Sequence, residues 1–239
     1  IKIKNQIVAD GLNRNEYDVT NVGNHLSAKE WNDCMDSGAI VVDVRNHYES
    51  RIGHFHGAIT PDVDTFREEL PIIRNKLKDK KEEKILLYCT GGIRCEKTSA
   101  YLKHQGFKDV NQLRGGIINY TKQIKEYALE NKFIGKNFVF DGRLGERISH
   151  DVIGTCDQCG NACDDYTNCN YVDCNLLFLQ CLSCKKKYKG CCTEDCQKMS
   201  KLPKEEQKKI RKARKRPSIR SFKKSIRPQE NITERKRNS

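Results

Sequence analysis

The chain has 239 residues, of which 32% are charged and 36% hydrophobic, and its formal net charge is +13. This length accommodates one domain of about 100 to 150 residues with a full core, together with smaller modules. No stretch approaches the roughly 18 consecutive apolar residues that a membrane span requires, and the N-terminus lacks the apolar core of a signal peptide. We therefore predict a cytoplasmic protein without membrane association.

The first 22 residues form a segment of their own. In the opening sequence IKIKNQIVADGL, Ile1, Ile3 and Ile7 alternate with other residues as they would in a β-strand. We interpret residues 1–22 as the remnant of a preceding N-terminal domain and its linker, so the native protein is expected to be longer.

A helix and a strand are predicted next. Ser27 and Glu30 form a capping box at the start of a helix that ends at Gly38. The β-branched run 39–45 follows as a buried strand. Residues 64–80 are helical in pattern, and Pro71 within them predicts a kink or a break between two short helices.

The chain is organised around residues 84–100, which read KILLYCTGGIRCEKTSA. The short apolar run 85–88 predicts a buried strand, and the residues from Glu96 onward favour a helix. Cys89 therefore lies where a strand passes through a loop into the N-terminus of a helix.

This loop suits a thiolate. Two glycines, Gly91 and Gly92, permit backbone angles that direct amides toward the sulfur of Cys89. Together with the positive helix end and Arg94, these amides favour the thiolate over the thiol and lower its pKa. We predict a nucleophilic, partly exposed Cys89; the structural alternative is an inert cysteine in an ordinary loop. The predicted active-site loop also contains Thr90, Ile93 and Cys95, the last of which either resolves an oxidised Cys89 or packs in the core.

Alternating elements continue after this loop. The helix ends near Gly106, a strand covers 110–113, and a further helix covers 118–130. The pattern predicts an α/β fold in which helices cover both faces of a parallel sheet, with Cys89 at the carboxyl edge of the strands. Residues 133–149 contain three glycines and alternate Phe138 and Phe140 with polar residues, which predicts an extended connector packed on this domain.

Ten of the 13 cysteines lie between Cys156 and Cys196. Reduced, metal-binding cysteines are favoured over disulfides because the chain is long, shows no secretion signal and contains CxxC pairs. Two such pairs have the spacing of a four-thiolate zinc ribbon: Cys156 with Cys159, and Cys181 with Cys184. The remaining six suffice for a second site whose four ligands stay open: Cys163, Cys169, Cys174, Cys191, Cys192 and Cys196.

Zinc is the favoured metal because so small and polar a module needs a metal to fold. An iron–sulfur cluster and a redox dithiol are the alternatives.

The tail, residues 201–239, carries +12 of the net charge, and its composition predicts disorder with a short helix over 203–215. It is expected to bind RNA phosphates, the alternative being a solubilising tail, through Lys208, Lys209, Arg211, Lys212, Arg214, Lys215 and Arg216.

The Cys89 loop resembles the active-site loop of rhodanese domains. Its C-x4-R spacing suits a persulfide sulfur, whereas the cysteine phosphatases use a wider C-x5-R loop, so phosphatase activity is disfavoured. Asp43, Arg45, Glu49 and the sequence GHFHGAI at 53–59 resemble the N-terminal rhodanese signature, whose residues brace the fold rather than react. The RGGI sequence at 114–117 resembles the element that closes these domains beside the active site.

Together with the sequence GKNFVFDGRLGERIS and the cysteine cluster, these motifs resemble the bacterial rhodanese-domain tRNA uridine hydroxylases, over residues 1 to about 207. That resemblance implies a tRNA-modifying oxidoreductase that uses molecular oxygen to form 5-hydroxyuridine at the wobble position, with Cys89 as the catalytic cysteine. Members of that family carry a further small α/β domain at the front, which this sequence does not contain.

Two other functions stay open: a sulfurtransferase that carries a persulfide on Cys89, and a non-catalytic tRNA-binding module. The electron donor, the set of tRNAs, any protein partner and the oligomeric state are not specified by the residues. The predicted domains are 1–22, the remnant; 23–132, the rhodanese domain; 133–152, the connector; 153–200, the zinc module; and 201–239, the tail.

Overall fold

The computed structural model describes residues 17–213, which form two compact units. Unit 1 extends to Val139 and includes Glu146–Asp151, whereas unit 2 comprises Phe140–Gly145 and the chain from Val152 onward. Within the described residues no helix is both long and apolar enough to cross a bilayer. The expected strand at the start of the chain lies outside these residues, as does the tail beyond 213.

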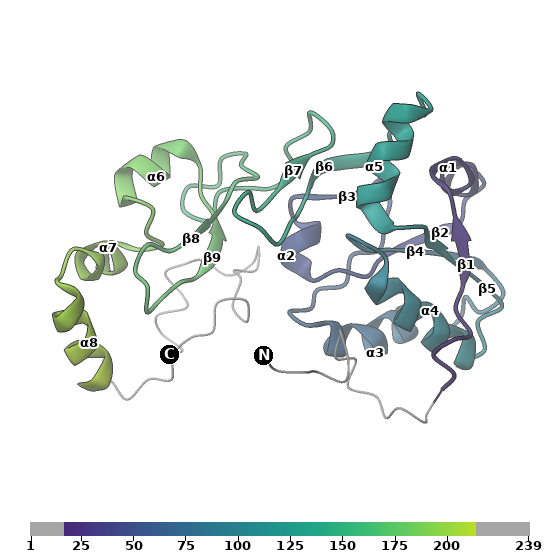
Figure 1. Ribbon diagram of the computed structural model, residues 1–239, viewed down its shortest axis with the longest axis horizontal. Coiled ribbons are helices and arrows are strands. Elements are labelled where there is room, and N and C mark those ends of the chain that lie inside the picture. Colours follow the sequence, from purple (N-terminus) through teal and green to yellow (C-terminus); the bar gives the residue numbers. More distant parts are fainter. Residues whose placement is uncertain (1–16, 214–239) are drawn as a thin grey trace. The chain divides into compact units, whose positions relative to one another are not determined.

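A four-stranded parallel sheet forms the centre of unit 1 (Figure 1). Its strands, in the spatial order β1-β5-β4-β2, are β1 (Asn24–Leu26), β5 (Asp109–Leu113), β4 (Lys84–Tyr88) and β2 (Ile40–Asp43). Because all of the strands are parallel, their carboxyl ends meet at one edge of the sheet. Cys89 follows β4 at that edge, as the sequence predicted.

Helices cover both faces of this sheet. Successive side chains of β4 point to opposite faces, so Ile85 and Leu87 pack in one core with α3 (Phe66–Lys76) and α4 (Ile93–His104). Leu86 and Tyr88 pack in the other core, with α1 (Ala28–Asp36) and α5 (Gly116–Glu126). Figure 1 shows the two helix pairs on opposite sides of the strands. The predicted fold class is confirmed.

The local helix signals were accurate at α1 and less accurate elsewhere. Ser27 and Glu30 form the predicted capping box. Of the two alternatives predicted at Pro71, a kink or a break between two short helices, the break is wrong, because α3 runs continuously through this residue. A proline removes one hydrogen bond from a helix interior, but the buried apolar face of α3 holds the helix together. Helix α5 begins earlier than predicted because Gly115 adopts a left-handed conformation, with φ of +69°, and caps it.

A second sheet joins distant parts of unit 1. Its strands are β3 (Gly53–Phe55), β6 (Phe133–Asn137) and β7 (Glu146–Arg147), in antiparallel order, and a short helix α2 (His47–Ser50) precedes them. The segment predicted as an extended connector therefore has sheet partners. Phe138 is buried against Tyr48, whereas Phe140 is 60% exposed.

Cysteine side chains make up a large part of the core of unit 2. Up to residue 213 this unit contains a two-stranded sheet and three helices: β8 (Tyr166–Asn168), β9 (Leu177–Leu179), α6 (Leu182–Tyr188), α7 (Glu194–Ser200) and α8 (Lys204–Ala213). Cysteines form most of its two buried clusters. Helix α8 is the short helix that was predicted within the basic tail.

Candidate active site and metal centres

The sulfur of Cys89 lies beneath the loop that joins β4 to α4. Cys89 is only 2% exposed, so the prediction of a partly exposed cysteine is wrong. The rim of the loop is exposed instead, at Gly91 and at Ile93, which is 51% exposed. The thiol is therefore enclosed by protein while the backbone above it faces solvent.

Hydrogen-bond donors surround this sulfur. The Gly92 amide donates to the Cys89 Sγ at 3.1 Å, and both the thiol and the amide of Cys95 also donate to it. The Cys95 thiol is the largest cause that lowers the pKa of Cys89 to about 6; burial opposes this shift, while the Arg94 charge and the two amides add to it. Gly92 has φ of +98° and caps α4, a conformation that favours glycine. The site thus favours a thiolate at neutral pH.

The guanidinium group of Arg94 is itself held in place by the carboxylate of Glu49. The two side chains form a bidentate ion pair, with Nη1 donating to Oε2 at 2.6 Å and Nη2 to Oε1 at 2.8 Å. Thr90 donates to the same carboxylate at 3.2 Å. Although burial raises it, the pKa of Glu49 lies below its ordinary value because of Arg94. This pair fixes one side of the loop.

A second buried ion pair braces the strands below. Arg45 binds Asp43 through two hydrogen bonds, of 2.8 and 2.6 Å, and donates to the carbonyl of Gly53 at 2.6 Å. Tyr88 donates to the same aspartate at 2.7 Å. Since all of these groups are buried, Asp43 and Arg45 connect strand β2 to the start of β3 and to the end of β4.

The start of α5 holds the loop from the other side. The amides of Ile117 and Ile118 donate to the carbonyls of Cys89 and Thr90, at 3.0 and 3.2 Å. A Cβ at Gly116 would lie 2.5 Å from the Cys89 carbonyl oxygen, so only glycine fits there without a shift. The GGI sequence therefore closes the loop by direct backbone contact.

Glu69 is an ionisable residue beside this site that the sequence patterns above did not single out. It lies in α3 and is 0% exposed. Its spacing from Phe66 and Ile73 places it on the buried face of the helix, and that pattern is visible in the sequence. A carboxyl group on an apolar helix face was the available signal.

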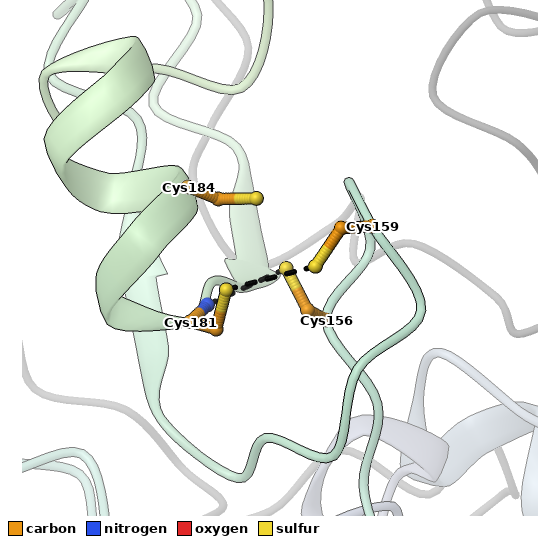
Figure 2. A group of neighbouring side chains, drawn as sticks. All are labelled: Cys156, Cys159, Cys181 and Cys184. Atoms are coloured by element: carbon orange, nitrogen blue, oxygen red, sulfur yellow. Dashed lines mark hydrogen bonds between the residues drawn. The ribbon is translucent and has the colours of Figure 1, made fainter.

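The two CxxC pairs converge on one point in unit 2. Figure 2 shows the four sulfur atoms pointing toward one another, two from a loop and two from the start of α6. The ligand atoms of Cys156, Cys159, Cys181 and Cys184 all lie within 4.8 Å of one another. The Cys159 and Cys181 sulfurs are 3.6 Å apart, close to the roughly 3.8 Å edge of a tetrahedron with zinc–sulfur bonds of about 2.3 Å. These residues fit a four-thiolate zinc ion.

A second group of four cysteines has the same geometry. It consists of Cys169, Cys174, Cys192 and Cys196, again within 4.8 Å. In both groups the amide of the third cysteine donates to the sulfur of the first: Cys181 to Cys156 at 3.4 Å, and Cys192 to Cys169 at 3.5 Å. The structure thus selects four of the six cysteines that the sequence left open.

Cys163 and Cys191 belong to neither group. The Cys163 thiol donates to the carbonyl of Asp165 at 4.0 Å, and the Cys191 thiol donates to that of Lys189 at 3.9 Å. Burial raises the pKa of Cys163 to about 11 and also raises that of Cys191. Both behave as buried thiols rather than thiolate ligands.

The predicted RNA-binding residues fall partly within the described chain. Lys208, Lys209 and Lys212 are exposed on α8, and the helix also includes Arg211. Arg214, Lys215 and Arg216 lie outside the described residues.

Comparison with protein families divides the chain in two. Residues 27–123 match the rhodanese-like domain, and residues 134–197 match the family described as rhodanase C-terminal. Residues 27–123, which contain strands β2, β4 and β5 of the parallel sheet and the cysteine at its carboxyl edge, thus match a rhodanese-like domain.

The chain is also similar to curated proteins named tRNA uridine(34) hydroxylase. It is 59% identical to the one from Leptospira interrogans over 229 residues, which are 95% of this chain and 62% of that protein. The protein of that name from Yersinia pestis is 51% identical over 226 residues, 94% of this chain and 63% of the relative. The chain thus spans somewhat less than two thirds of the length of these relatives.

Among solved structures, a thiosulfate sulfurtransferase from Pseudomonas aeruginosa is similar to 42% of this chain, with 23% identity and a TM-score of 0.37; the match covers 19% of that chain.

Proposed function

We propose that this protein is part of an oxygen-dependent tRNA hydroxylase that converts the wobble uridine to 5-hydroxyuridine. The observation that carries the proposal is the 59% identity, over 229 residues, to a protein named tRNA uridine(34) hydroxylase. That similarity spans the thiolate loop and both cysteine clusters. The enzyme is then an oxidoreductase that acts on tRNA.

In this proposal Cys89 is the nucleophile. Its thiolate adds to the uracil ring, and the Gly92 and Cys95 amides, with Arg94, stabilise the anionic form of the site before the attack. The base approaches along the exposed rim at Gly91 and Ile93. Glu49 keeps the Arg94 guanidinium in place, so it has a positioning role.

Molecular oxygen is the proposed co-substrate. One oxygen atom is transferred to carbon 5 of the ring, and reduction of the other to water requires two electrons and two protons. The electrons come from an external donor, because the proposed ring chemistry leaves Cys89 a thiolate at the end of the cycle.

Zinc is the metal that we propose for both cysteine clusters. Four thiolates of one tetrahedron leave no open position for substrate, so each ion has a structural role. With zinc in both clusters, unit 2 would present α8 with its exposed lysines to tRNA phosphates.

The α8 contact can be tested by charge reversal. Replacing Lys209 and Lys212 by glutamate should weaken tRNA binding and reduce its salt dependence. The control replaces Lys122 and Lys125, exposed at the same spacing on α5 of unit 1. Equal losses in both variants would show that net charge, rather than α8, determines binding.

The activity is tested by mass spectrometry of nucleosides from tRNA incubated aerobically with the protein and a reductant. We expect one oxygen atom to be added to the wobble uridine by the unchanged protein and not by Cys89→Ala. Cys34→Ala is the matched control, since Cys34 packs in the core on the opposite face of the sheet. Addition of sulfur instead would assign the site to sulfur transfer, and oxygen addition by Cys89→Ala would exclude Cys89 as the nucleophile.

A further inference from the structure

A buried carboxyl group without a partner lies beside the thiolate loop. Glu69 is fully buried in α3, with Phe66, Leu70 and Ile73 on the same helix face. Among the residues that the structure describes, neither of its carboxyl oxygens has a hydrogen-bond partner. A charged carboxylate in such a place would be very unfavourable, so the surroundings of Glu69 decide its protonation state.

The charged groups that face Glu69 come from four other parts of unit 1. They are Arg94 of α4, Asp43 of β2, Glu49 of α2 and Cys89 at the end of β4. Only Arg94 is cationic, and Glu49 already binds both of its terminal nitrogens. Asp43 is likewise bound by Arg45. Glu69 therefore faces two carboxylates and a thiolate, while the cation among these groups, Arg94, is bound by Glu49.

The pKa values of Glu69 and Cys89 are shifted in opposite directions by these surroundings. Burial, together with the negative charges of Asp43, Glu49 and Cys89, raises the pKa of Glu69 well above its ordinary value, against the opposing effect of Arg94. The pKa of Cys89 is lowered to about 6. Both shifts act against the order in which a carboxylic acid and a thiol lose their protons in water. Two neighbouring groups with opposite shifts are typical of an acid and a base that act together.

We propose that Glu69 is the protonated partner of Cys89: it stays a neutral carboxylic acid while the sulfur is a thiolate, and it releases its proton more readily once the sulfur has lost its charge. The two groups are thus coupled, and each affects the proton affinity of the other equally. Glu69 is a positioning residue: it affects the reaction only through the charges of Cys89 and Arg94.

This role holds whether Cys89 acts on uracil or carries sulfur, so it goes beyond the proposed function. Alkylation illustrates the step. The thiolate attacks the carbon of iodoacetamide, a carbon–sulfur bond forms, and iodide leaves with the bonding electrons. No proton is exchanged at sulfur. The loss of negative charge lets Glu69 release a proton to solvent at a lower pH than before.

The test is an infrared titration of the full chain, before and after Cys89 is alkylated near neutral pH. Modification at Cys89 is verified by mass spectrometry of its peptide. A protonated carboxylic acid has a carbonyl band separate from those of carboxylates. We expect such a band to persist above the pH at which Cys89 ionises, and its midpoint to move to lower pH after alkylation.

Two variants assign the band. Glu69→Gln should remove it, whereas Glu68→Gln, at the exposed neighbouring position on α3, should leave it. If Glu69→Gln does not fold, ¹³C labelling of glutamate in the unchanged protein distinguishes this band from those of aspartate.

Two results would overturn the inference. One is a wild-type protein without a carboxylic-acid band at neutral pH, or with a band that alkylation does not move. The other is a lower midpoint for Cys89 alkylation in Glu69→Gln than in the unchanged protein, since that shift means that an ionised Glu69 was opposing the thiolate. Neither measurement uses tRNA, so their failure leaves the hydroxylase proposal unaffected.

Discussion

The two units use cysteine in opposite ways. In unit 1 a single sulfur, that of Cys89, is held by a core of apolar side chains and by amide and thiol donors. In unit 2 the cysteines themselves make up much of the buried clusters, beside aromatic and aliphatic residues such as Tyr171 and Phe178. A thiolate needs compensation for its charge in either place. Protein groups supply it in unit 1, whereas in unit 2 we propose that a cation balances each group of four sulfurs.

This difference predicts that the units depend on different things. Unit 1 should be sensitive to single substitutions in its buried hydrogen-bond network and insensitive to metal. Unit 2 should show the reverse behaviour, because its cysteine clusters are organised by the ions that we propose.

Metal removal should have the largest effect. Chelation should unfold unit 2 and leave unit 1 folded, because structural zinc contributes on the order of 10 kcal/mol to the folding of small modules. Hydrogen exchange of the full chain, with and without chelator, measures this: protection should be lost within residues 152–200 and retained in β4 and α4. Retained protection in unit 2 would show that its apolar core is sufficient.

Metal content tests the assignment of ligands. The unchanged protein should bind two zinc ions, since two separate groups of four cysteines are present among the described residues. Cys184→Ser and Cys192→Ser should each lose one ion. Cys163→Ser is the matched control and should keep both, because its thiol donates to a carbonyl outside either group.

The sequence predicted those features that local patterns determine. The strand before Cys89, the helix after it and the glycines between them are contiguous, so the thiolate loop could be inferred directly. The first group of four cysteines was also predictable because each CxxC turn brings its two sulfurs together. The second group of four was not predictable, because the sequence does not show that Cys163 and Cys191 lie outside it, with their thiols donating hydrogen bonds to backbone carbonyls.

Other features depend on contacts between distant residues. Cys89 is enclosed because α5 binds the loop carbonyls, a contact between segments more than 25 residues apart in the chain. The pattern of α3 places Glu69 on an apolar face. Only the packed structure shows that both terminal nitrogens of Arg94 already donate to Glu49. Sheet partners for residues 133–135 likewise come from β3.

The ion pair between Arg94 and Glu49 should give the largest effect of a single substitution on the stability of unit 1. Glu49→Gln leaves Arg94 buried without its counter-charge, which should destabilise the protein by about 3–5 kcal/mol. Urea unfolding of the metal-loaded protein measures the loss. The control is Asp33→Asn, which removes an exposed pair with Lys29 and should change stability little. Similar results for both variants would mean that the Glu49 pair does not brace the loop.

A smaller effect is expected where α5 meets the loop. Gly116→Ala places a Cβ against the Cys89 carbonyl at a residue with φ of +64°, so it should cost about 1–3 kcal/mol and slow alkylation of Cys89. Gly91→Ala, where a Cβ would meet nothing within 4 Å, is the control. A stable, normally reactive Gly116→Ala protein would show that the backbone contact is dispensable.

The smallest effect concerns the Cys95 thiol, the main cause of the low pKa of Cys89. Because that pKa is lowered from 9.0 to about 6, the thiolate predominates above pH 6 and the alkylation rate falls as the pH decreases through this value. Cys95→Ala should move the midpoint upward, whereas Cys95→Ser keeps a donor and should stay close to the unchanged protein. If the pKa returned fully to 9.0, the thiolate fraction at pH 7 would fall roughly 90-fold. Mass spectrometry of the Cys89 peptide across a pH series measures the midpoint. An unmoved midpoint in Cys95→Ala would show that the loop amides and Arg94 hold the thiolate without the second sulfur. Unit 1 would then stabilise its thiolate by backbone and charge alone.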